Sequence, residues 1–260
     1  MSLLEAFGAG PGSMVAAVGG GGKTSLVFRL SLEAEERRIP AAVTTTVKFT
    51  RPAGLPMPPI AVTDAAGLRA RCAAALAADG AVTLVSGEGD RGRLLGFAPV
   101  AIDGLRGPGR LVLVEADGSA HRPFKAPAAH EPVIPGAATH VVVCAGLQAL
   151  GKPLDERWVH RPEVAARLCG LRPGQPLTAE AMAAVLLHPE GGRKGVPAGA
   201  RLFALLNAPA GFDGGRDAGA IAELLAEGGF EAAVIATAHL GIVYEVWRHG
   251  MVSAPAAHHG

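Results

Sequence analysis

The sequence predicts an α/β protein of the P-loop NTPase-like class, with a mostly parallel sheet flanked by helices. Short apolar runs alternate with helical patterns along the chain, as parallel sheets with crossover helices require. The apolar run at 14–18 stops at four glycines, and a helical pattern begins at Lys23. A strand, a glycine-rich turn and a helix in this order form half of a βαβ unit.

The first half of the chain predicts strands joined by short helices. The helix at 23–36 is followed at once by a strand candidate at 41–44, as a parallel crossover requires. Asp64 is placed to cap an alanine-rich helix that ends near Ala78, before Gly80. Several other runs are continuously apolar, which indicates strands buried on both faces. The remaining elements are a short helix at 2–7, a weak strand at 60–63, and strands at 81–85, 111–114 and 139–144.

The second half of the chain adds two helices with no strand between them. They lie at 161–169 and 178–188, separated by a stretch rich in proline and glycine. The elements that follow are a strand at 202–206, a helix at 217–226 and strands at 232–235 and 242–247. We interpret residues 1–260 as one domain, with a helix-rich insertion at roughly 146–200 and a disordered tail at roughly 253–260.

The composition is that of a globular protein, with 49% hydrophobic and 18% charged residues. A net charge of +1 gives no bulk attraction to nucleic acid or to an anionic membrane, so we expect neither as a partner. The three cysteines lack CxxC spacing, which argues against a zinc knuckle or a disulfide framework. Pro135 and Gly136 interrupt the uncharged stretch at 133–151, and the N-terminus lacks a basic signal region. We therefore expect a cytoplasmic protein.

The glycine loop fits most of the Walker pattern GxxxxGK[ST], with Ala17 in place of the first glycine. Glycines let backbone N–H groups turn toward phosphate oxygens, and a helix N-terminus adds partial positive charge. Lys23 is expected to neutralise β- and γ-phosphate oxygens, and the Thr24 hydroxyl to reach Mg²⁺. The predicted nucleotide-binding residues are Gly19, Gly20, Gly21, Gly22, Lys23, Thr24 and Ser25. The implied cofactors are Mg²⁺ and ATP.

Two alternatives compete for this segment. One is a glycine-rich hairpin followed by a lysine, and the other is a Rossmann loop with the pattern GxGxxG. Counted from Gly20, the sixth position is Ser25, and a Rossmann loop gives no reason for Lys23. The phosphate-loop interpretation therefore explains more of the residues.

Two carboxylates follow the apolar run at 111–114. Glu115 and Asp117 are two residues apart, so both point to the same face of an extended strand. Mg²⁺ prefers oxygen ligands, and one carboxylate can hold the metal while the other orients a nucleophile. We predict Thr24, Glu115 and Asp117 as metal ligands, and Lys23, Glu115 and Asp117 as catalytic residues. The alternative is solvated charge in a turn.

Polar residues also follow the strand at 41–44. Thr45, Thr46 and Lys48 can contact a γ-phosphate, a metal or an acceptor, and we predict them as second-ligand residues. For the threonines, β-branched residues in an edge strand are an equally good explanation. Asn207 also follows a strand but lacks the NKxD pattern that reads guanine. ATP is therefore the expected nucleotide, with GTP left open.

A longer signature carries a resemblance to a known family. Residues 114–135 have the sequence VEADGSAHRPFKAPAAHEPVIP, and VGGGGKTS, TTTVKF and VHRPEVAA occur at 18–25, 44–49 and 159–166. With these motifs the chain resembles the selenium-dependent molybdenum hydroxylase accessory protein family, YqeC type. The resemblance implies a role in maturing a molybdenum hydroxylase or its cofactor, and that enzyme or cofactor as a partner. It implies no particular reaction.

The same signature contains ionisable residues that could bind a ligand or transfer a proton. Arg122 and Lys125 can bind a second anionic ligand, such as a phosphate or a pterin-type group. His130 and Glu131 can form a proton donor and acceptor pair. A structural role in an ordered loop is an equally good explanation for His130. These four join the predicted second-ligand residues.

Three functions agree with these residues. The first is a Mg²⁺-dependent NTPase, or a phosphoryl or nucleotidyl transferase, that binds a nucleoside triphosphate and acts in cofactor maturation. The second is a nucleotide-gated chaperone or scaffold that delivers selenium or molybdenum cofactor without chemistry of its own. The third is an ATP-dependent amide ligase, by analogy with the short GTNGKT-type loop of Mur-type ligases.

Overall fold

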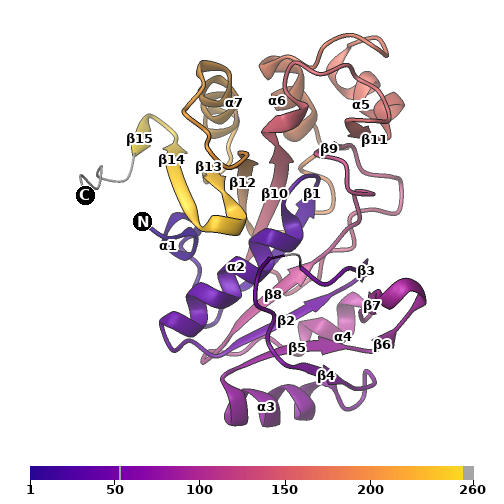
Figure 1. Cartoon of the computed structure of the whole chain (residues 1–260), viewed down its shortest axis with the longest axis vertical. Helices are drawn as coiled ribbons and strands as arrows, with labels where there is room; N and C mark the ends of the chain where they lie inside the picture. The colour runs from indigo at the N-terminus through magenta and orange to yellow at the C-terminus, as the bar shows by residue number, and fades with distance from the viewer. Residues whose placement is uncertain (53, 254–260) are drawn as a thin grey trace.

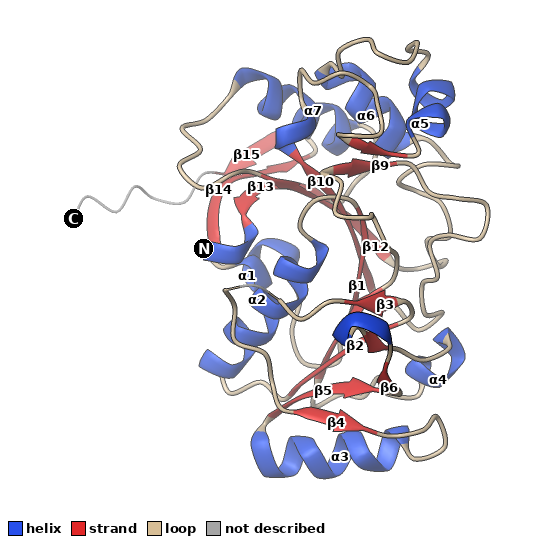
Figure 2. Ribbon diagram, turned by 45° about the vertical axis from the view of Figure 1, so that its right-hand side comes forward, coloured by secondary structure: helices blue, strands red, loops and turns tan. Residues whose placement is uncertain are grey.

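The computed structural model describes residues 1–52 and 54–253. A large central sheet runs through the molecule, with helices on both of its faces (Figures 1 and 2). Its strands lie in the order β15 (Met251–Ser253), β14 (Ile242–Arg248), β13 (Ala232–Thr237), β12 (Arg201–Asn207), β10 (His140–Gly146), β1 (Met14–Gly19), β8 (Leu111–Glu115), β2 (Ala41–Thr45), β5 (Ala81–Val85) and β4 (Ile60–Val62). From β13 to β4 every neighbouring pair is parallel, whereas β14 and β15 are antiparallel. The predicted, mostly parallel α/β fold is confirmed.

Apolar composition explains the inner strands. β1, β8 and β10 are buried along almost their whole length, as expected for continuous apolar runs covered on both faces. Every predicted strand is present, with slightly shifted boundaries. β8 lies between β1 and β2, so the acidic end of β8 is directly beside the strand that leads into the glycine loop.

Helices cover the two faces of the sheet with separate cores. They are α1 (Leu3–Phe7), α2 (Lys23–Glu36), α3 (Leu68–Asp79), α4 (Pro99–Asp103), α5 (Pro162–Cys169), α6 (Ala179–Leu187) and α7 (Arg216–Glu227). Alternate residues of a strand point to opposite faces. Thus Ala17 of β1 packs in the core of α1 and α2, whereas Ala16 packs in the core of α6 and α7. α3 and α4 cover the part of this second face that includes Met14.

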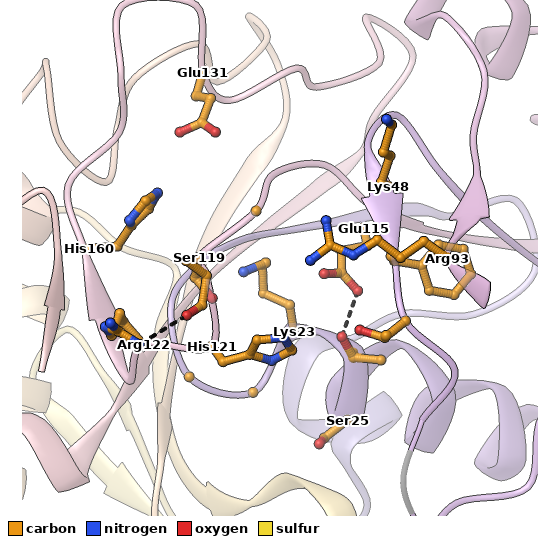
Figure 3. Close-up of a pocket in the computed structure, with 17 residues that line it drawn as sticks. Lys23, Ser25, Lys48, Arg93, Glu115, Ser119, His121, Arg122, Glu131 and His160 are labelled. Atoms are coloured by element: carbon orange, nitrogen blue, oxygen red, sulfur yellow. Dashed lines mark hydrogen bonds between the residues drawn. The ribbon is translucent and has the colours of Figure 1, made fainter. Parts of the chain in front are cut away.

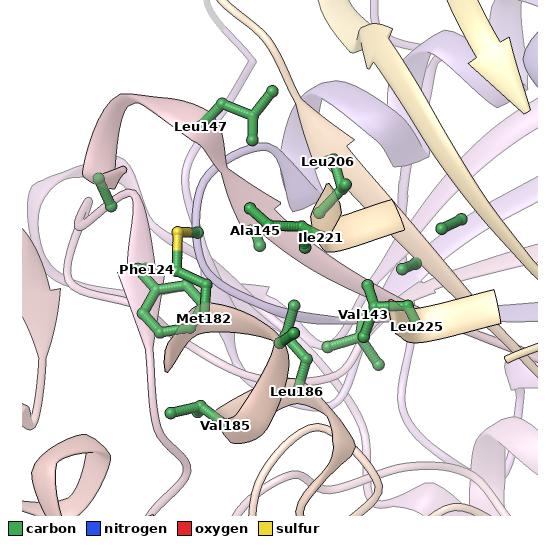
Figure 4. Packing of buried hydrophobic residues seen from close by; sticks show 14 of the residues in the cluster. Phe124, Val143, Ala145, Leu147, Met182, Val185, Leu186, Leu206, Ile221 and Leu225 are labelled. Carbon is green, nitrogen blue, oxygen red and sulfur yellow. The ribbon is translucent and has the colours of Figure 1, made fainter. Parts of the chain in front are cut away.

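The core of α6 and α7 lies against β10. Figure 4 shows Met182 and Leu186 of α6 beside Ile221 and Leu225 of α7, with Val143 of β10 in the same cluster. All of these side chains are almost completely buried. This packing ties α6, which belongs to the segment between β10 and β12, to the main sheet.

The start of α3 differs from the prediction, whereas its end agrees with it. Asp64 Oδ1 accepts a hydrogen bond from the Gly67 N–H at 2.7 Å, and α3 begins after this turn, at Leu68. The prediction that Asp64 caps the helix was wrong, because its side chain closes the preceding turn. Gly80 ends the helix with a left-handed φ of 72°, as predicted.

Two small sheets were not predicted. One is antiparallel and consists of β3 (Lys48–Phe49), β7 (Leu94–Leu95) and β6 (Gly87–Glu88), and the other pairs β9 (Phe124–Lys125) parallel to β11 (Val159–His160). Strands of this length are too short to show a hydrophobic period. The first sheet packs tightly on β2, since a Cβ on Gly96 would lie 1.8 Å from the carbonyl oxygen of Thr45.

The insertion predicted at 146–200 corresponds to the connection between β10 and β12. It contains α5 and α6, as its helical patterns predicted, while the single-domain interpretation stays a prediction. Ser253, expected to begin the tail, is the last residue of β15. The rest of the predicted tail, 254–260, lies outside the described residues. Within the described part of the chain, no helix combines the length and apolar character that a membrane crossing needs.

Candidate functional site

Backbone contacts shape the glycine loop that joins β1 to α2. Gly19 has a left-handed φ of 92°, and a Cβ on it would lie 2.3 Å from the carbonyl oxygen of Cys144. Only glycine fits this position without a shift of β10. The Gly20 N–H donates to the same carbonyl at 2.9 Å, which anchors the loop to the neighbouring strand. Gly22 is the N-cap of α2, and the start of this helix lines a cavity.

Lys23 is buried and bonded to the loop itself. Its Nζ donates to the Gly19 carbonyl at 2.6 Å and lies 3.3 Å from Asp117 Oδ1. Burial acts to lower the pKa of Lys23, but the carboxylates of Asp117 and Glu115 outweigh burial and hold this pKa above its ordinary value. The lysine is therefore charged, and a phosphate that entered the loop would compete with protein oxygens for it.

Thr24 and Glu115 bring two oxygens together at the mouth of the loop. The Thr24 hydroxyl donates to Glu115 Oε2 at 2.8 Å, and both residues line the cavity. Burial raises the pKa of Glu115, although Lys23 and the Thr24 hydroxyl act in the opposite direction. No cluster of three or more His, Cys, Asp or Glu residues suited to a metal occurs among the described residues. A hydroxyl and one carboxylate fit Mg²⁺, which takes most of its ligands from phosphates and water.

Asp117 has a different environment from Glu115. It is 1% exposed, and its Oδ2 accepts from the Gly19 N–H at 2.9 Å and pairs with Lys125 Nζ at 2.9 Å. Its Oδ1 lies within ion-pair distance of Lys23 but accepts no hydrogen bond from the described residues. Because both oxygens face protein groups, Asp117 is placed as a brace of the glycine loop. Its contacts do not suit the metal ligand or catalytic group that its spacing suggested.

An ionic network, buried at Asp117 and Lys125 and partly exposed at its far end, continues from Asp117 toward α5. Lys125 Nζ pairs with Glu131 Oε2 at 2.8 Å, and Arg161 Nη1 approaches the same oxygen at 2.8 Å. Burial alone would raise the pKa of Glu131, but the hydrogen bond and charge of Lys125, helped by the Ala128 N–H and Arg161, lower it to about 2. Arg161 is the N-cap of α5. The network therefore joins the glycine loop to the start of the insertion helices.

The cavity above the loop has a volume of about 450 Å³. Its floor is the start of α2 together with Glu115. Side chains from distant parts of the sequence stand around it: His121, Arg122 and His160 on one side, and Lys48 and Arg93 on the other (Figure 3). The cavity thus brings together part of each predicted set: the end of the glycine loop, two of the three predicted metal ligands and some of the second-ligand residues.

Three predicted second-ligand residues line this cavity, namely Lys48, Arg122 and Glu131. Glu131 is held by the ionic network, and Arg122 donates to the backbone carbonyls of Glu156 and Ala120. Lys48 is exposed. Two of the predicted basic residues, Lys48 and Arg122, are therefore at the cavity, whereas the expected pair of His130 and Glu131 is not assembled there.

The other predicted second-ligand residues do not line the cavity: Thr45, Thr46, Lys125 and His130. Thr45 Oγ1 donates to the Glu115 carbonyl at 2.7 Å, and Thr46 Oγ1 donates to the Val133 carbonyl at 2.8 Å. These hydroxyls tie the end of β2 to the neighbouring strand and loop. The lysine belongs to the ionic network, and the histidine is exposed.

Several cavity residues were not predicted: Phe49, Thr50, Arg93, Ser119, His121 and His160. His121 has a left-handed φ of 60°, and Ala120 before it has a φ of 48°. Non-glycine residues in this region cost free energy and often cluster at functional sites. Nothing in the local pattern marks Arg93, because only the small sheet brings it to the cavity.

Asn207 supports the loop from behind. Its Oδ1 accepts a hydrogen bond from the Ala238 N–H at 3.0 Å, and its Nδ2 would lie 2.7 Å from a Cβ on Gly22. The side chain thus packs between a strand end and the glycine loop. It contributes to the shape of the loop and does not line the cavity.

The sheet, the glycine loop and the helix that follows it define an α/β protein whose architecture is consistent with the P-loop NTPase-like class. The family described as YqeC protein matches residues 15–163 of the chain. A protein of Escherichia coli (strain K12), described as uncharacterized protein YqeC, is 36% identical over 199 residues, which cover 75% of each chain. The chain therefore belongs to the YqeC family. No solved structure matched it.

Proposed function

We propose that this protein binds a nucleoside triphosphate with Mg²⁺ and hydrolyses it or transfers its phosphoryl or nucleotidyl group. ATP is the expected nucleotide, with GTP left open. The observation that carries the proposal is the hydrogen bond between Thr24 and Glu115, beside the buried Lys23, where a glycine loop enters a helix. Hydroxyl, carboxylate and lysine are the groups that phosphate-loop chemistry uses at these positions.

Binding would rearrange Lys23. In the structure the lysine holds the Gly19 carbonyl and faces Asp117. A triphosphate in the loop would receive backbone N–H groups and the partial positive charge of α2, and Lys23 would turn from its protein partners to a phosphate oxygen. Asp117 would keep Lys125 as its ion-pair partner, 2.9 Å away, so its buried charge would remain compensated.

Thr24 and Glu115 would hold the metal ion, which supplies charge neutralisation at the β- and γ-phosphates. Burial disfavours the charged form of Glu115, so a cation at this position would favour its carboxylate form. Lys23, next to Thr24 in the chain, would stabilise negative charge on the group that is transferred. In this proposal Lys23 therefore serves the phosphates, whereas Thr24 and Glu115 serve the metal.

The biological role that we propose is maturation of a selenium-dependent molybdenum hydroxylase or its cofactor. Membership of the YqeC family and the signature at 114–135 support it. The signature forms one wall of the cavity and most of the ionic network. Residues of this signature therefore line part of the proposed nucleotide site.

Turnover of ATP with Mg²⁺ tests the chemical part of the proposal. Replacing Lys23 by Ala removes the buried positive charge, so we expect turnover to fall about 100-fold or more. Lys152→Ala is the control, because this lysine stands over the Trp158 ring in the insertion. Equal turnover in wild type and Lys23→Ala, with the hydroxylase or its cofactor present, would contradict the proposal.

A nucleotide-gated chaperone or scaffold is the second candidate, and the ionic network favours it. The network links Lys23 through Asp117, Lys125 and Glu131 to Arg161 at the start of α5. Phosphate binding at Lys23 would therefore change the charge balance at the insertion. Nucleotide retention without turnover, together with nucleotide-dependent association with a molybdenum hydroxylase, would favour this candidate over an enzyme.

A further inference from the structure

The cavity holds positive charge that the protein leaves uncompensated. Lys48, Arg93 and Arg122 line it, and none of them forms an ion pair within residues 1–52 and 54–253. The two carboxylates that line it form no ion pair with these three residues, since Glu115 accepts a hydrogen bond from Thr24 and Glu131 is bound by two other cations. In a chain with a net charge of only +1, three such cations at one cavity indicate an anionic ligand.

The Lys48 and Arg93 side of the cavity is built on a fixed backbone. Phe49 pairs with Leu94 between β3 and β7, and the Phe97 N–H donates to the Thr45 carbonyl at 3.0 Å. Phe49 is 3% exposed and its ring lies 6.0 Å from that of Phe28. The small sheet is therefore held on the body of the protein, with Lys48 and Arg93 at the cavity (Figure 3).

The opposite side of the cavity is a strained loop. Ala120 and His121 both have left-handed φ values, and the Arg122 N–H donates to the Ser119 carbonyl at 2.9 Å. The Arg122 guanidinium also donates to two backbone carbonyls. Such strain persists only where surrounding contacts enforce it. The loop therefore presents Arg122 across the cavity from Lys48 and Arg93.

The first of these two sides is on the γ-phosphate side of the proposed nucleotide site. Thr24 and Glu115 would hold the metal ion, which would neutralise charge on the β- and γ-phosphates. Glu115 ends β8, which pairs with β2, and β2 leads directly into β3 and Lys48. Lys48 and Arg93 would therefore lie beside the group that is transferred. Their positive charges are additional to those that Lys23 and the metal would supply to the triphosphate.

We propose that this cavity takes a second substrate, a small molecule with a carboxylate or phosphate group, held by Lys48 and Arg93 with Arg122 facing them. This inference rests on the proposed nucleotide function and names the class of acceptor. Arg and Lys are the usual partners of these anions, and their charge offsets the repulsion between two anionic substrates. The protein then acts as a phosphoryl transferase with a specific acceptor, not as a simple hydrolase.

With such an acceptor, the phosphoryl transfer forms one bond to phosphorus and breaks another. An ionised acceptor oxygen attacks the γ-phosphorus, and the bond from this phosphorus to the β–γ bridging oxygen breaks. The bridging oxygen leaves with the electron pair on the nucleoside diphosphate. A carboxylate or phosphate oxygen carries no proton to be removed, so the products are a nucleoside diphosphate and an acyl phosphate or phosphoanhydride.

Calorimetric titration of the protein saturated with Mg²⁺ and the non-hydrolysable analogue AMP-PNP tests this inference. Inorganic pyrophosphate and succinate are the two probes, and they distinguish a phosphate from a carboxylate ligand. We expect one of them to bind wild type, and Lys48→Gln combined with Arg93→Gln to weaken it about tenfold or more. Arg51→Gln is the matched control, because Arg51 lies close to Lys48 in sequence but pairs with Glu88.

The outcomes separate the inference from the function on which it rests. Failure of both probes to bind the AMP-PNP complex, or equal binding by the double variant, would overturn the acceptor site alone. A double variant that weakens AMP-PNP instead of the probe would also overturn it, because the two cations would then serve the γ-phosphate. Failure of wild type to bind AMP-PNP would overturn the proposed function as well.

Discussion

Single residues at the end of β8 have roles that depend on their immediate partners. Glu115 faces the cavity and Thr24, whereas Asp117, two positions later, is enclosed by Gly19, Lys23 and Lys125. Burial penalises the charge of Glu115 and raises its pKa, while Asp117 has two cations beside it. The candidate metal ligand Glu115 and the structural brace Asp117 are therefore only two positions apart in the sequence.

Replacing each carboxylate by its neutral amide should affect stability at one position and nucleotide binding at the other. Asp117→Asn leaves the buried Lys23 without its ion-pair partner, so we expect the free energy of unfolding to fall by about 3 kcal/mol or more. Glu115→Gln removes a charge that burial disfavours, so stability should change little while Mg²⁺-dependent nucleotide binding is lost. Denaturant unfolding and nucleotide titration of both variants check this. A stable Asp117→Asn protein that fails to bind Mg²⁺ would reverse the two assignments.

The sequence could not separate these two carboxylates. Their spacing indicates only that both follow a buried strand, which is why we predicted the same metal and catalytic roles for each. Lys125 makes the difference, and its position depends on the pairing of β9 with β11, residues far apart in the sequence. Thr45 and Thr46 show the same limit, because their backbone partners are set by tertiary packing.

Among the elements, length decided what could be predicted. Inner strands such as β1 and β8 are continuous apolar runs, and the glycine loop stands between such a strand and a helical pattern, so both were recognised. β3 and β7 consist of two residues each and have no readable period, yet they bring Lys48 and Arg93 to the cavity. The sequence therefore predicted the glycine loop, Lys48 and Arg122 as candidate site residues, and the structure brings them to one cavity, whereas nothing in the sequence pointed to Arg93.

The link between the signature loop and α5 should depend on pH. The pKa of Glu131 is about 2 in the folded protein, below the ordinary value of 4.5. A lowered folded pKa contributes stability that is complete above pH 4.5 and is lost as the pH falls toward 2. We expect the free energy of unfolding to decline through this window more steeply in wild type than in Glu131→Gln. Parallel pH profiles for the two proteins would show that the carboxylate contributes no such stability.

At the scale of the whole molecule, one edge of the sheet gathers the residues of the candidate site. The carboxyl ends of β1, β2 and β8 carry the glycine loop, the start of the small sheet and Glu115, as open parallel sheets place their ligand sites. The network from Lys23 to Arg161 then connects this edge with the insertion between β10 and β12. Phosphate binding and the position of the insertion helices are therefore expected to be coupled.

Stability in the presence of Mg²⁺ and AMP-PNP tests the central claim most directly, because any ligand that binds only the folded state stabilises it. At 100 times its dissociation constant, the analogue should raise the free energy of unfolding of wild type by about 2.7 kcal/mol. We predict that this gain is lost in Lys23→Ala, is reduced when EDTA removes Mg²⁺, and is unchanged in Lys152→Ala. No gain in wild type, or the same gain in Lys23→Ala, would contradict a nucleotide site at the glycine loop.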